Sequence, residues 1–166
     1  VHVGQWGTFV TTPEIRPAAA TGAVRVTVDN GTARDAAVRV STQIYGLDSG
    51  GGKSGPAIAR IAPAARRVPA GGSAVAEGKT TVANPKLWGP PPRQKPNLYV
   101  AVTTIEQAGK IIDRYETPFG IRKVECRPDG LFVNGGRIRI QGVNQHHDLG
   151  ALGAAFNVRA AARQLE

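Results

Sequence analysis

Residues 23–44 read AVRVTVDNGTARDAAVRVSTQI, and this stretch decides the fold. Valines alternate with polar residues up to the turn sequence Asp29-Asn30-Gly31, and the alternation resumes at Val38. A period of two places apolar side chains on one face of a strand and polar side chains on the other. The stretch therefore predicts two half-buried strands separated by a turn.

Further strands are expected toward the C-terminus. The pattern predicts them over residues 57–62, 73–82, 98–105 and 110–117, with turn residues between them. Six or seven short strands over about 100 residues are typical of a β-sandwich of the immunoglobulin type. Cys126 is the single cysteine, so no internal disulfide stabilises it. We expect a mainly β protein with this sandwich over residues 20–122.

Residues 1–19 are interpreted as a connector that enters the sandwich. They contain the β-prone run TFVTTPEIRP, in which Pro13 and Pro17 lack the backbone N–H that sheet pairing uses. The chain opens without an initiator methionine, a basic segment or an apolar segment, so any targeting signal is expected outside it.

The pattern changes after Gly120. Residues 131–142 predict a hairpin around Asn134-Gly135-Gly136, because Asn-Gly accepts the positive φ that such turns require. A polar loop and a helix follow, with Asn157 as the N-cap. One βα unit cannot bury its own sheet, and a closed (β/α)8 barrel takes about 250 residues. Residues 123–166 are therefore expected to be the truncated start of a second domain.

Composition argues against two classes of partner. The 166 residues carry 21 Lys+Arg and 12 Asp+Glu, a formal net charge of +9. The basic residues are dispersed, as at Arg25, Arg39 and Arg60, whereas a nucleic-acid surface needs them gathered on one face. A solvated sheet face explains them better. No apolar run approaches the roughly 20 residues of a membrane helix, so no bilayer-spanning segment is expected.

The densest group of polar and titratable residues lies just after the predicted strand end. It comprises Asn144, His146, His147 and Asp148. Imidazoles, an amide and a carboxylate supply donors and acceptors, and binding residues of βα folds collect at this position. The alternative is that Asn144 and one histidine cap the loop backbone while Asp148 turns the chain. Adjacent residues project in different directions, so we expect neither a metal nor a cofactor here.

Two other motifs have simpler explanations. The run from Gly50 to Ser54 reads GGGKS, but Leu47 stands where a phosphate loop needs its first glycine, and this predicts a flexible hairpin loop. Trp88 lies in a proline-rich turn, where stacking on a sugar is one option. Packing at the end of the sandwich or between domains is the favoured one.

Four stretches in order resemble glycoside hydrolase family 2, most closely its bacterial β-galactosidases. They read VGQWGTFVTTPEI (3–15), NPKLWGPPPRQKPNLY (84–99), DRYETPFGIRKVE (113–125) and DGLFVNGGRIRIQGVNQHHDLGALGAAFNVRAAARQLE (129–166). The resemblance implies a jelly-roll sugar-binding domain upstream, the immunoglobulin-like sandwich here, and a (β/α)8 barrel that begins here and is completed by the rest of the parent chain.

The resemblance also implies an activity, the hydrolysis of terminal β-D-galactosides or related β-linked sugars with retention of configuration. That chemistry uses two carboxyl groups roughly 5–5.5 Å apart. In the family these are glutamates on later barrel strands, with the acid/base following an asparagine. The sequence contains no Asn-Glu pair, so this chain is expected to hold no catalytic residue.

What the chain is expected to contribute is substrate binding. Gly142-Val143-Asn144-Gln145-His146 matches a family pattern in which the histidine hydrogen-bonds sugar hydroxyls. The match implies that His146 holds a hydroxyl as a neutral imidazole and that Asp148 accepts from one or two others. His147 is expected to orient Asp148. The competing hypothesis is a stand-alone carbohydrate-binding or scaffolding sandwich.

Overall fold

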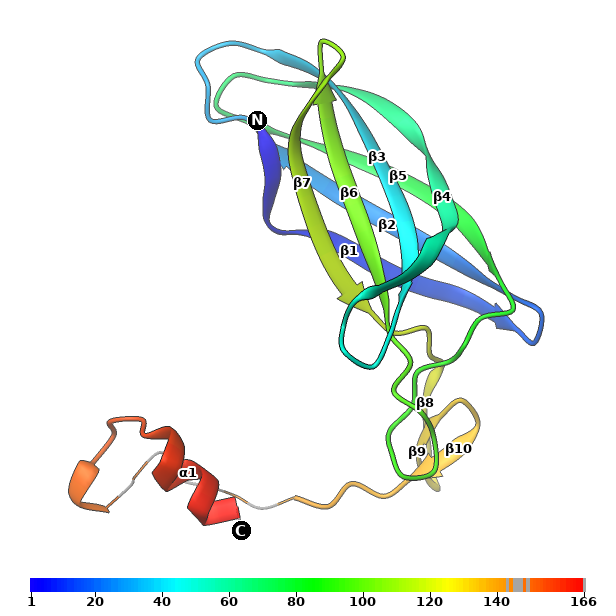
Figure 1. The fold of residues 1–166 in the computed structure, drawn as a ribbon, viewed down its shortest axis with the longest axis vertical. Helices are drawn as coiled ribbons and strands as arrows, with labels where there is room; N and C mark the ends of the chain where they lie inside the picture. The colour runs from blue at the N-terminus through cyan, green and yellow to red at the C-terminus, as the bar shows by residue number, and fades with distance from the viewer. Residues whose placement is uncertain (143, 145–147, 149, 166) are drawn as a thin grey trace.

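The chain is mainly β in its computed structural model, which describes residues 1–142, 144, 148 and 150–165 (Figure 1). The long strands are β1 (His2–Arg16), β2 (Ala19–Asp29), β3 (Ala36–Leu47), β4 (Lys53–Val68), β5 (Ser73–Ala83), β6 (Tyr99–Gln107) and β7 (Lys110–Phe119). The short elements are β8 (Val124–Arg127), β9 (Gly130–Val133), β10 (Gly136–Ile138), the 3-10 turn η1 (Gly150–Leu152) and the helix α1 (Val158–Leu165).

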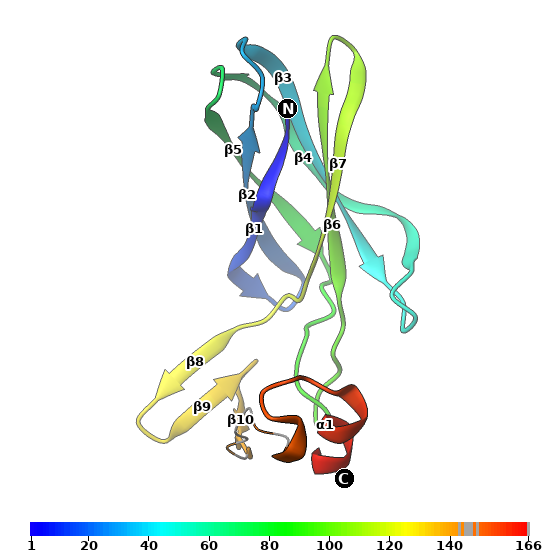
Figure 2. The same cartoon turned by 90° about the vertical axis from the view of Figure 1, so that its left-hand side faces the viewer.

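Two antiparallel sheets face each other to form a sandwich (Figure 2). One has the order β1-β2-β5 and the other β4-β3-β6-β7. The predicted alternation is confirmed, because Val24, Val26 and Val28 point into the core while Arg25 is exposed. They pack with a set of apolar side chains from both sheets, including Val38, Val40, Val68 and Ile105.

A second apolar cluster closes the sandwich near β8–β10. It contains Ile44, Tyr99 and Ile121, and the Tyr99 and Phe119 rings stack with centroids 5.7 Å apart. The Tyr99 hydroxyl accepts a hydrogen bond from the backbone N–H of Lys86 at 2.7 Å. Burial raises the pKa of Tyr99 above its ordinary value, and this hydrogen bond offsets part of that rise.

The N-terminal segment differs from the expected connector. Its residues form β1, which pairs with β2 as an edge strand of the sandwich. Pro13 lies where the register shifts, between Thr11 and Glu14. An edge strand needs hydrogen bonds on one side only, so the missing proline N–H costs the sheet little there. A second shift lies between Val3 and Thr8 and includes Trp6, which has φ 56° and is 84% exposed.

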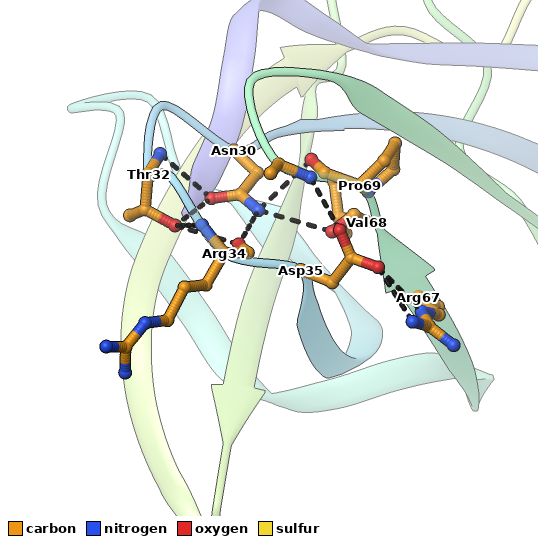
Figure 3. A network of polar contacts seen from close by, with 8 residues as sticks. Asn30, Thr32, Arg34, Asp35, Arg67, Val68 and Pro69 are labelled. Atoms are coloured by element: carbon orange, nitrogen blue, oxygen red, sulfur yellow. Dashed lines mark hydrogen bonds and ion pairs between the residues drawn. The ribbon is translucent and has the colours of Figure 1, made fainter.

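A buried asparagine ties the two sheets together at the end away from β8–β10 (Figure 3). Asn30 is 2% exposed, and its Nδ2 donates to the backbone oxygens of Arg34 (2.8 Å), Val68 (3.2 Å) and Pro69 (3.1 Å). Its Oδ1 accepts from the N–H of Thr32 at 3.1 Å. The amide therefore joins the β2–β3 loop to the end of β4, which belongs to the other sheet.

The C-terminal part has a small sheet and a helix. The predicted hairpin is present as β9 and β10. The strand predicted to continue to Gly142 ends at Ile138, because β10 is an edge strand and the described residues provide no partner for its outer side. Asn157 caps α1 as predicted, with its Oδ1 accepting from the N–H of Ala160 at 3.1 Å. Every described residue over 139–159 is exposed, and α1 lies apart from both sheets (Figure 1).

Candidate functional site

The hairpin β9–β10 determines where the chain enters the predicted loop. Its turn residues Asn134 and Gly135 have φ 53° and 77°, the paired positive values of a two-residue turn that matches strand twist. Asparagine accepts this left-handed conformation more readily than most residues. The sequence prediction of the turn is confirmed, and the candidate loop begins a few residues after β10.

Two amide side chains hold this turn against the loop that joins β5 to β6. Asn134 donates through Nδ2 to the backbone oxygen of Trp88 and to Gln94 Oε1, both at 2.8 Å. Its Oδ1 accepts from the N–H of Lys123 at 3.0 Å. Gln94 Nε2 donates to the backbone oxygen of Val133 at 2.8 Å. We call this pair of side chains the Asn134–Gln94 latch.

Trp88 packs at the same junction. Its N–H donates to the backbone oxygen of Ile121 at 2.8 Å, and the guanidinium carbon of Arg122 lies 5.0 Å from its ring centroid. A Cβ on Gly120 would lie only 2.6 Å from the Trp88 Cβ, so the two residues are in close contact. The Trp88 side chain thus packs against Gly120 and Arg122 at the end of the sandwich, in agreement with the favoured packing role.

The structure describes two of the four predicted loop residues. Asn144 is exposed on irregular backbone. Asp148 is also exposed, and its Oδ1 accepts from the N–H of Gly150 at 2.9 Å. His146 and His147 lie outside the described residues. The Asp148 bond fits the interpretation in which it turns the chain, but a carboxylate has about four acceptor sites and keeps capacity for sugar hydroxyls.

The carboxylates near the junction do not resemble a general acid. A hydrogen bond from Lys123, followed by the charges of Arg127 and Lys123, holds the pKa of Glu125 below its usual range. A hydrogen bond from Lys53 has the largest effect in lowering the pKa of Glu116. A glycosidase general acid needs a raised pKa, so these ionised groups serve as partners for cations.

The described residues meet neither the requirements of a metal site nor those of a membrane-spanning helix. Within 1–142, 144, 148 and 150–165, no three His, Cys, Asp or Glu side chains form a metal-binding group. Cys126 is an exposed free thiol. No helix in the described part of the chain has the length and apolar character needed to cross a membrane.

Sequence reasoning missed Gln94 and the use of Gly120. Gln94 lies in a proline-rich segment, and nothing in its sequence neighbourhood distinguishes a latching amide from a solvated one. Gly120 lies next to a predicted strand end and not in a predicted turn. A glycine at such a position can indicate that another segment approaches the backbone closely, as Trp88 does here.

Known proteins resemble this chain along its length. The family model of glycosyl hydrolases family 2 matches residues 1–122. The β-galactosidase BoGH2A of Bacteroides ovatus is 34% identical over 168 residues, covering 100% of this chain and 18% of that protein. A β-glucuronidase of Formosa agariphila is 30% identical over 140 residues, covering 84% of this chain and 13% of that protein.

Solved structures share the fold. A glycosyl hydrolase family 2 member from Bacteroides cellulosilyticus aligns with a TM-score of 0.76 and 28% identity, covering 99% of this chain and 21% of that one. A family 2 β-glucuronidase aligns with a TM-score of 0.74 and 28% identity, covering 93% of this chain and 16% of that one. The chain spans less than a quarter of each of these four proteins. Since the family model matches most of its residues, the chain belongs to glycosyl hydrolase family 2.

Proposed function

We propose that the chain is part of a retaining β-glycosidase that hydrolyses terminal β-D-galactosides. The observation that carries this proposal is the 34% identity to a β-galactosidase across the whole chain, including the loop after β10. The chain supplies a structural sandwich and one substrate-binding loop. The two catalytic carboxyl groups belong to other parts of the parent enzyme.

The sandwich supports an immunoglobulin-like assignment. Seven antiparallel strands in a three-stranded sheet packed on a four-stranded sheet are the architecture of such domains. Because β1 pairs with β2, we now place the beginning of this domain at β1 and its end near Arg122. An upstream sugar-binding domain remains part of the proposal.

We assign residues 123–166 to the first hairpin, strand and helix of a (β/α)8 barrel. Large apolar side chains are exposed here, with Ile140 at 77%, Phe156 at 70% and Val158 at 71%. Several large apolar groups exposed within one segment favour a surface that another part of the protein covers. Later strands and helices of a barrel would bury them and would extend β10 by pairing with its open edge.

The loop contributes hydrogen bonds to the sugar. His146 as a neutral imidazole and Asn144 hold hydroxyls of the sugar at the cleavage position. Asp148 accepts from one or two hydroxyls with a charge-assisted bond, and His147 orients it. These contacts assist catalysis to the extent that they strengthen as the ring flattens toward the oxocarbenium-like transition state.

The test uses the full-length enzyme with p-nitrophenyl β-D-galactoside and β-D-glucuronide. We expect the galactoside to be cleaved with the higher kcat/KM and the β-anomer to form first in NMR spectra. Replacing His146 by alanine should lower kcat/KM, and the decrease should correspond to a loss of ~1–3 kcal/mol of transition-state stabilisation. His2→Ala, at an exposed position of β1, is the matched control and should change nothing.

Each result has a clear meaning. Preference for the glucuronide would replace galactose as the substrate and leave the glycosidase assignment in place. Initial release of the α-anomer would refute retention. Equal kcat/KM for His146→Ala and the unmodified enzyme would refute the assigned role of His146.

A further inference from the structure

We propose that the Asn134–Gln94 latch positions the substrate-binding loop, so that Asn134 and Gln94 are positioning residues of the enzyme. This inference rests on the proposed function of the loop. The latch joins three separate backbone segments, at Trp88, Lys123 and Val133, and it does so immediately before the chain leaves β10.

Turn formation alone does not explain the asparagine. The β6–β7 turn has φ 50° at Ala108 and 78° at Gly109, close to the 53° and 77° of Asn134 and Gly135. Ala108 therefore occupies the equivalent position of a turn with the same positive φ values, although it has no side-chain amide. The Asn134 amide is instead engaged at Nδ2 and Oδ1 by groups outside the hairpin.

The surroundings of Gln94 are shaped for its side chain. A Cβ on Gly89 would lie 2.0 Å from Gln94 Oε1, and a Cβ on Gly136 would lie 3.0 Å from Gln94 Nε2. Glycine at both places lets the amide lie between the β5–β6 loop and the hairpin. The N–H of Gly89 also donates to the backbone oxygen of Lys95 at 2.9 Å, which closes the loop around Gln94.

The latch joins the hairpin, whose Phe132 and Val133 side chains are buried, to the β5–β6 loop. In the described chain, β8, β9 and β10 form a separate sheet that pairs with no strand of the sandwich. Short strands with a free edge do not set their own direction relative to a neighbouring domain. The latch, together with Trp88, fixes that direction and with it the direction in which the chain leaves β10. Misplacing a binding group by ~1 Å can lower a rate by two orders of magnitude.

The experiment uses four variants of the full-length enzyme. Asn134→Gly keeps the positive φ and removes the amide, and Gln94→Ala removes the other half of the latch. Ala108→Gly makes a comparable turn change without a latch. Val68→Ala creates a cavity in the core at the opposite end of the sandwich, as a control for lost stability. Thermal unfolding, kcat and KM are measured for each, with hydrogen exchange by mass spectrometry over residues 130–142.

We expect Asn134→Gly and Gln94→Ala to speed exchange over residues 130–142 and to lower kcat/KM for the galactoside about tenfold, within the range that misplacement produces. Assays well below each Tm keep the enzyme folded, so Val68→Ala and Ala108→Gly should retain the kcat/KM of the unmodified enzyme.

Three results would overturn the inference. The first is a hydrogen-exchange rate over residues 130–142 that is unchanged in both latch variants. The second is faster exchange with an unchanged kcat/KM. The third is a loss of kcat/KM in Val68→Ala as large as that in the latch variants when their Tm values are similar. If the unmodified enzyme cleaves no β-glycoside, the proposed function fails instead. Hydrogen exchange then decides whether the latch holds the hairpin.

Discussion

Gly120→Ala tests the packing of the junction most directly. The added Cβ would lie 2.6 Å from the Cβ and 2.7 Å from the Cγ of Trp88. Carbon atoms prefer separations of about 3.5–4.0 Å, so the two groups must move apart by roughly 1 Å. The φ of Gly120 lies outside the left-handed region, so the penalty comes from Trp88 and not from the backbone.

Trp88 has little room to move. Its N–H is bonded to the backbone oxygen of Ile121, and its own backbone oxygen accepts from Asn134. Overpacking costs about 1–3 kcal/mol, and displacing one of these bonds adds about 1 kcal/mol. We therefore expect Gly120→Ala to lower the free energy of unfolding by about 2–4 kcal/mol.

The measurement is equilibrium urea unfolding of the 166-residue chain, followed by far-UV circular dichroism. Gly46→Ala is the matched control, because a Cβ at Gly46 meets no atom within 4 Å and its φ is ordinary. In a Trp88→Gly background both the Cβ and the Cγ that the new group would meet are absent, so Gly120→Ala should then cost less than about 0.5 kcal/mol. An unfolding midpoint equal to that of Gly46→Ala, or a full penalty in the Trp88→Gly background, would refute the reasoning.

Two further predictions concern the ends of the sandwich. Asn30→Ala removes the Nδ2 donor that the carbonyls of Arg34, Val68 and Pro69 share, and the same urea assay should show a loss of about 1–3 kcal/mol. A loss near zero would contradict the role of Asn30 in joining the sheets. Burial raises the pKa of Tyr99 above 10.0, so its contribution to stability is complete below that pH and is lost as pH rises through the folded-state value. Urea midpoints should therefore fall more steeply above about pH 10 in the unmodified chain than in Tyr99→Phe, and equal slopes would contradict the prediction.

The sequence predicted which strand residues are buried, because side-chain alternation determines the face on which each residue lies. Val24, Val26 and Val28 are buried because period two assigns each residue of a strand to a face. The same pattern does not indicate which strands lie at the edge of a sheet, where backbone hydrogen bonds are needed on one side only. Pro13 therefore misled the interpretation of β1, since a residue that would disrupt a central strand is tolerated in an edge strand at a register shift.

The candidate loop was located by composition and by resemblance, and its roles remain predictions. Asp148 illustrates the difficulty, because one carboxylate can accept from the Gly150 N–H and still bind a sugar. Residue types alone cannot separate the two uses. Gln94 is the opposite case, because its use depends on Gly89 and Gly136 leaving space in two other segments, which no local pattern reveals.

The sandwich and the β9–β10 hairpin are stabilised by different kinds of contact, and this difference has a consequence for function. The sandwich is held by apolar clusters that draw on both sheets, together with the Asn30 contacts. The hairpin buries only Phe132 and Val133 among its described residues, and the hydrogen bonds of the Asn134–Gln94 latch join it to the β5–β6 loop. Hydrogen bonds contribute about 1 kcal/mol each, far less than a buried core. Substitutions in the latch can therefore alter the position of the loop while most of the stability remains, which is why activity and unfolding must be measured together.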